Sequence, residues 1–114
     1  MATRKIEKSR LKDYLDHFSS IMPDEQAEIE VAGLDLGDQI EAEWAIMSGI
    51  SYDPKDDVVV VDINNGELMH MIRKPVDFEV TEDDDGVHAF EIRCGEGHLH
   101  IIRLKTPQPA PQGE

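Results

Sequence analysis

Seven runs of alternating apolar and polar residues follow one short helix-like segment, and this rhythm limits the possible folds more than any other feature. Successive side chains of a strand point to opposite faces of a sheet, so alternation indicates strands with one buried face and one wet face. The runs span residues 27–31, 40–52, 58–63, 68–73, 76–80, 87–94 and 99–105. Tight-turn residues separate nearly all of them. Asn64-Asn65-Gly66 is the strongest hairpin signal, because Asn-Gly tolerates the positive φ of a tight hairpin. The sequence therefore predicts an antiparallel sheet.

The longest run predicts a bent strand. Ile40, Ala42, Trp44 and Ile46 alternate with Gln39, Glu41 and Glu43, so they should share one face. The same phase continues through Ile50 and Tyr52, and we expect a bend or bulge near Gly49.

One helix is expected over residues 9–21. Its apolar side chains recur every three or four positions and form one stripe: Leu11, Tyr14, Leu15, Phe18, Ile21 and Met22. Ser9 is a plausible N-cap and Pro23 ends the helix. A helix this short is marginal alone in water, so it should dock on the sheet.

These elements predict an α+β, mainly β fold, in which the N-terminal helix packs on a strongly bent, seven-stranded antiparallel meander or half-barrel. Short loops favour pairing between consecutive strands. Two stacked sheets are the alternative. The 114 residues divide into a basic arm (1–8), one globular domain (9–105) and a proline-rich tail (106–114) that we expect to be disordered.

Charge and composition narrow the possible partners. The formal net charge of −14 disfavours binding to nucleic acid or to a membrane surface, since both are anionic. The single cysteine, Cys94, permits no intramolecular disulfide, which fits a reducing compartment. No secretory signal or stretch of membrane-spanning length is apparent, so a cytoplasmic protein is expected.

The basic residues are concentrated at the N-terminus. Five of the eleven (Arg4, Lys5, Lys8, Arg10 and Lys12) lie in the first 12 positions. Pairing of the first two strands should place four glutamates together: Glu28, Glu30, Glu41 and Glu43. We hypothesise that this glutamate face meets the basic arm, within one chain or across a homodimer. The alternative is a solvated face whose exposed ion pairs contribute about 0–1 kcal/mol. A glycosidase-like acid and base pair is weaker, because the four carboxylates have equivalent surroundings.

The last predicted hairpin carries a weak metal-like cluster. His98 and His100 should point to the same side of their strand, and a turn over residues 95–97 places Cys94 opposite His98. Thiolate and imidazole are zinc ligands, but a convincing fourth ligand is missing. The alternative is a buried cysteine beside two histidines at the rim. We assign no cofactor, with zinc as the open alternative.

A small ligand could bind at the mouth of the half-barrel, near Trp44, Tyr52 and His70. His70 shares its phase with Leu68 and Ile72, so it should face inward. No catalytic residue can be assigned, because the sequence lacks a nucleophile elbow and a glycine-rich phosphate loop.

Several segments carry a family resemblance: AEIEVAGLDLGDQIEAEW, GISYDPKDD, MIRKP at 71–75 and IIRL at 101–104. They resemble an uncharacterised bacterial family of short proteins, domain of unknown function 5335. The likeness covers nearly the whole chain and implies a single small bacterial domain, with no activity, cofactor or site residues to carry over. The function expected from the residues is therefore a non-catalytic protein-interaction domain, either monomeric or homodimeric, with an unknown partner. A ligand- or metal-binding protein is the alternative.

Overall fold

A computed structural model describes residues 2–22, 24–33 and 37–110 of the chain. Its elements, in chain order, are β1 (Ala2–Lys5), α1 (Lys8–Ile21), β2 (Glu25–Gly33), β3 (Gly37–Asp53), β4 (Val58–Ile63), β5 (Leu68–Arg73), β6 (Asp77–Asp83), β7 (Gly86–Arg93) and β8 (Leu99–Gln108). In the described part, the strands form one eight-stranded sheet in the order β1-β6-β7-β8-β2-β3-β4-β5. The predicted α+β, mainly β class is confirmed, and the sheet is not closed.

The sheet consists of two meanders rather than one. Strands β2 to β5 pair in sequence, as do β6 to β8, and the pairing of β8 with β2 joins the two sets. The expectation that every strand pairs with its predecessor is therefore wrong at the step from β5 to β6. That connection contains Lys74 at φ +52° and Pro75, which lacks an N–H for a ladder bond. The predicted basic arm also supplies an eighth strand, because β1 pairs with β6.

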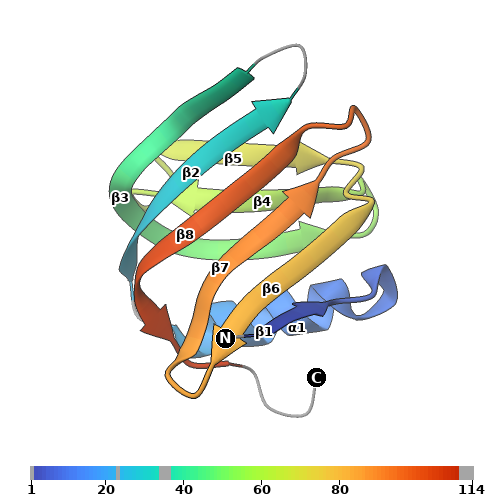
Figure 1. Cartoon of the computed structure of the whole chain (residues 1–114). Coiled ribbons are helices and arrows are strands. Elements are labelled where there is room, and N and C mark those ends of the chain that lie inside the picture. Colours follow the sequence, from blue (N-terminus) through green and yellow to red (C-terminus); the bar gives the residue numbers. More distant parts are fainter. Residues whose placement is uncertain (1, 23, 34–36, 111–114) are drawn as a thin grey trace.

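Strand β3 produces the strong bend. Its ladder with β2 shifts register twice, and its ladder with β4 shifts once more between Met47 and Gly49, close to the expected bend. Figure 1 shows β3 leading from the layer of β2, β8, β7 and β6 to the layer of β4 and β5. Each extra residue reverses which face the following side chains occupy. The expected shared phase is therefore wrong, because Ile40, Trp44 and Ile46 are exposed whereas Ile50 and Tyr52 are buried. Trp44 also has φ +49°.

Helix α1 lies at the lower opening of the bent sheet in Figure 1. It begins at Lys8, before the expected Ser9 cap, and ends at Ile21 as predicted. Its buried stripe omits Ile21, which is exposed: Leu11, Tyr14, Leu15 and Phe18. The Phe18 ring meets the Phe90 ring of β7 edge-on, with centroids 5.1 Å apart. In the described residues no helix is long and apolar enough to cross a membrane.

Strand β8 extends three residues into the predicted tail. Gln108 is buried, and its amide donates to Glu25 Oε2 at 3.1 Å. Gly86 has φ +122°, and a Cβ there would lie 2.2 Å from Gln108 O, so only glycine fits this close approach. Ala110 packs against the core. Residues 111–114 of the predicted tail lie outside the described residues.

Candidate functional site: the edge strand β5

Strand β5 is one of the two edges of the sheet, and its ladder partner is β4. In the described part of the chain, its backbone accepts one bond from a loop, from Gly95 N to Arg73 O at 3.4 Å, at its last residue. A strand edge with unpaired N–H and C=O groups is a template for another strand. β5 therefore presents a surface on which a further strand could pair.

The side chains of β5 make this edge unusually apolar. Leu68, Met69 and Met71 are 47%, 52% and 42% exposed. The segment 68–76 contains two basic residues, Arg73 and Lys74, and no acid, in a chain with 25 acidic residues. The edge strand is thus an apolar, weakly basic strip on an otherwise acidic protein.

On the inner side of β5, His70 meets His100 of β8. The two nitrogens, His70 Nε2 and His100 Nδ1, are 2.9 Å apart, and the ring centroids are 5.1 Å apart. The curvature of the sheet causes this contact, because β5 and β8 are four places apart in the strand order. The predicted inward orientation of His70 fits this contact, and the histidine pair joins the edge strand to the middle of the sheet.

Burial keeps the His100 ring neutral near pH 7. His100 is 7% exposed, and desolvation lowers its pKa from 6.5 to about 4, with smaller contributions from the nearby His70 and His98. A neutral imidazole carries one N–H and one acceptor nitrogen, so one ring of the pair donates to the other. Neutral imidazole is also the form that ligates metals.

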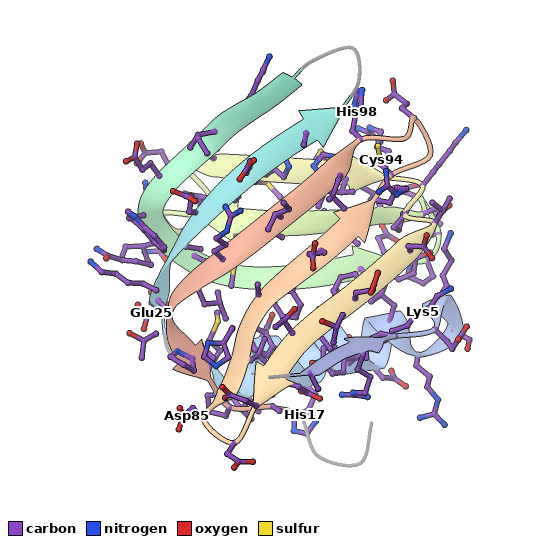
Figure 2. The ribbon with its side chains drawn as sticks, in the orientation of Figure 1. Lys5, His17, Glu25, Asp85, Cys94 and His98 are labelled. Carbon is purple, nitrogen blue, oxygen red and sulfur yellow. The ribbon has the colours of Figure 1, made fainter. Side chains whose placement is uncertain are left out.

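The predicted hairpin of Cys94 and His98 is present, but it does not assemble a metal site. Cys94 N donates to His98 O at 3.0 Å, so Cys94 lies opposite His98 as we expected, and Ile92 pairs with His100. Figure 2 shows Cys94 and His98 near each other at the β7–β8 turn. Within the described ranges, however, no three His, Cys, Asp or Glu side chains are arranged to hold a metal ion.

The three residues predicted to line a ligand mouth have different surroundings. The Trp44 side chain is exposed on the bulge of β3. Tyr52 is buried near the start of α1, where its hydroxyl donates to Asp57 Oδ1 at 2.6 Å. Desolvation and this bond raise the pKa of Tyr52 to about 12, so it stays protonated. Of Trp44, Tyr52 and His70, it is His70 that contacts His100.

The basic arm and the glutamate face each have other partners within the chain. Arg4 lies 3.0 Å from Glu82, Lys5 lies 3.2 Å from Asp77, and Lys8 lies 3.0 Å from Asp57. These three contacts reach β6 and the turn before β4.

Arg103 of β8 lies on the glutamate face instead. Its Nη1 atom is 2.9 Å from both Glu28 Oε1 and Glu30 Oε1. These two carboxylates raise the pKa of Arg103, and the bond to Glu30 contributes most. Glu43 is exposed, and the side chain of Glu41 lies outside the described residues.

Sequence reasoning missed the outer edge of β5 as a site. The pattern placed residues 68–73 in a strand, but it could not show which strands lie at the edges. One available signal was the acid-free segment 68–76, which includes Met69 and Met71, although 44–52 and 97–113 also lack acidic residues.

Comparison with known proteins identifies the family. A model of the family of unknown function DUF5335 matches residues 2–113. The chain belongs to this family. An uncharacterised protein of Aquifex aeolicus (strain VF5) is 35% identical over 112 residues, which cover 98% of this chain and 100% of that protein. No solved structure matches the chain. The match to DUF5335 thus includes both edge strands of the sheet, β1 and β5. The family description gives no activity, so the function is inferred from the site.

Proposed function

We propose that this domain is a non-catalytic protein-interaction module that forms a homodimer in the cytoplasm, β5 against β5 about a twofold axis. The observation that carries the proposal is the exposed, apolar edge of β5, which in the described chain has one ladder partner, β4. Strand addition of this kind gains backbone hydrogen bonds along the edge and specificity from the alternating side chains. Six residues give a shared ladder of about 20 Å. A cytoplasmic location agrees with the single, buried Cys94.

A second copy of this chain is the partner that fits, because the β5 segment complements itself. In an antiparallel pair centred on His70, Met69 of one copy faces Met71 of the other, and Leu68 faces Ile72. Glu67 of one copy then faces Arg73 of the other. All of these pairs join side chains of the same face, because the register preserves the strand's alternation. Such mutual contacts are the property of an isologous twofold interface.

The distribution of charge in the chain also favours a second copy as the partner of β5. Two copies that each carry −14 repel one another over most of their surfaces. The repulsion is reduced where 68–76 lies against itself, since this segment holds no acid. The two Glu67–Arg73 contacts add attraction at both ends of the ladder. Opposite-charge pairs across a ladder contribute about 0.2–1 kcal/mol each.

Sedimentation equilibrium of the full chain over a range of concentrations tests the proposal. We expect a reversible dimer. Met71→Lys should weaken it by more than about tenfold, because it places a charge on the apolar strip of both copies, and lysine is a residue that blocks edge pairing. Ile40→Lys is the matched control: Ile40 is also an exposed apolar residue (50%), but it lies on β3, so the dimer should persist. A monomer at all concentrations, or equal weakening by both substitutions, would overturn the proposal.

A charge exchange tests the register. Glu67→Arg and Arg73→Glu should each weaken the dimer by roughly tenfold, because each turns two attractive contacts into two repulsive ones. The double variant Glu67→Arg/Arg73→Glu should restore the affinity. Failure of the double variant to recover would exclude the pairing centred on His70.

A further inference from the structure

The histidine pair lies on the inner face of β5, the face opposite Met69 and Met71. We propose that His70 and His100 are the core of a binding site for a divalent late first-row transition metal, with Zn²⁺ as the probe. Imidazole nitrogen is a preferred ligand for Zn²⁺, Cu²⁺ and Ni²⁺. This site lies within one chain and does not depend on the dimer. It also differs from the set predicted from the sequence, because His70 takes the place of Cys94.

The distance between the two rings is close to what a metal requires. Zn–N bonds of about 2.0–2.1 Å at a tetrahedral angle place two ligand nitrogens about 3.3 Å apart. The observed distance between His70 Nε2 and His100 Nδ1 is 2.9 Å. The rings therefore need to separate by roughly 0.4 Å and tilt. His70 can move this far because β5 is an edge strand with one ladder partner, β4.

The single hydrogen bond between the two rings can be replaced by a metal ion. The hydrogen between the two rings moves to an outer nitrogen when the metal takes its place. Each ring then presents one lone pair to the ion and one N–H to its surroundings.

His98 is the candidate third ligand. It lies two residues before His100, just ahead of the first residue of β8, and its ring is close enough to interact electrostatically with His100. Three ligands are not assembled in the part of the chain that is described, and water would complete the coordination. We therefore expect an open site that binds more weakly than a closed four-ligand zinc site.

Isothermal titration of the untagged full chain with Zn²⁺ tests the site. We expect one site per chain, and no equivalent binding of Mg²⁺, which prefers oxygen ligands. His70→Gln should lower the Zn²⁺ affinity at least about tenfold, because the amide can still donate to His100 but is a poor zinc ligand. His17→Gln, on α1, is the matched control and should leave the affinity unchanged. Equal affinity in wild type and His70→Gln, or equal binding of Mg²⁺, would overturn the site.

Two further measurements locate the bound Zn²⁺ and test whether its site depends on the dimer. Hydrogen exchange of the wild type needs no variant: Zn²⁺ should slow amide exchange in β5 and at the start of β8. Slowing confined to another region, such as the acidic turn at residues 82–85, would refute the proposal. Met71→Lys should keep its Zn²⁺ affinity even as a monomer. Loss of binding in that variant would show that the site is not built within one chain.

Discussion

The two edge strands of the sheet, β1 and β5, differ in length, charge and apolar exposure. β1 has four residues, two of them basic, and both form ion pairs with carboxylates on the neighbouring β6. β5 has six residues, of which the first five carry no formal charge, and three apolar side chains are exposed. Short, charged edges resist the addition of another strand, whereas longer apolar edges invite it. The chain thus protects one edge and leaves the other available, and this contrast is why we assign the interaction to β5.

The two edges are also anchored to the domain by different forces. β5 is anchored by a buried side chain, Ile72, and by the histidine pair. β1 is anchored mainly by charge: Arg4 pairs with Glu82, and its guanidinium lies 5.8 Å from the centre of the Tyr14 ring. Apolar burial is insensitive to moderate salt, whereas ion pairs are screened. The two anchors should therefore respond differently to substitution, pH and salt.

The largest effect is expected at the apolar anchor of β5. Ile72 is fully buried, so Ile72→Ala should lower the free energy of unfolding by about 3 kcal/mol, within the 2–5 kcal/mol found for such cavities. Met69→Ala, on the exposed side of the same strand, should change it by less than about 0.5 kcal/mol in the monomer. Urea unfolding at low protein concentration measures both. Equal effects would show that β5 is not anchored through its inner face.

Acid should weaken the second anchor of β5. The pKa of His100 is about 4 in the folded chain and near 6.5 when it is unfolded, so below pH 6.5 the unfolded chain binds more protons. The free energy of unfolding should therefore fall as the pH falls from 6.5 to 4, by at most about 3 kcal/mol and by about 2 kcal/mol at pH 5. The charges of His70 and His98 contribute to the same lowering of the His100 pKa, less than desolvation does.

Urea unfolding in the presence of a chelator at pH 7 and pH 5 measures this effect. His100→Asn is the reference, because an amide can still bond to His70 but does not titrate between these values. The pH dependence of the wild type should exceed that of the variant. Identical slopes would mean that His100 binds protons equally in the folded and the unfolded chain, so that burial does not lower its pKa.

Local patterns predicted most of the strands, because they depend on neighbouring residues. The alternation in 58–63 and 68–73 corresponds to β4 and β5, and Asn64-Asn65-Gly66 forms the turn between them with positive φ at all three residues. The register shift near Gly49 was also foreseeable, since glycine in a strand often marks a bulge.

Longer-range features could not be predicted from the pattern. The pairing of β8 with β2 joins segments about 70 residues apart and leaves no local signal. His70 was expected to face inward, but its partner His100 depends on the curvature of the whole sheet. The exposure of Trp44 follows from bulges in β3 that reverse the phase of the strand. The strand positions of His70 and His100 could thus be predicted from the local pattern, whereas their contact depends on the tertiary fold.

The smallest effect is expected at the charged edge. Arg4→Gln removes the pair with Glu82 and the contact with the Tyr14 ring, so it should lower the free energy of unfolding by about 1 kcal/mol. In 1 M NaCl the Debye length falls to about 3 Å, and the effect should shrink by roughly half. Lys12→Gln, which breaks the exposed pair with Asp16 on α1, is the control and should have a smaller effect at low salt. The loss caused by Ile72→Ala should stay constant in the same titration, because a cavity is not screened. An equal effect of salt on the losses of unfolding free energy caused by Arg4→Gln and Ile72→Ala would contradict the claim that β1 is anchored by charge and β5 by apolar burial.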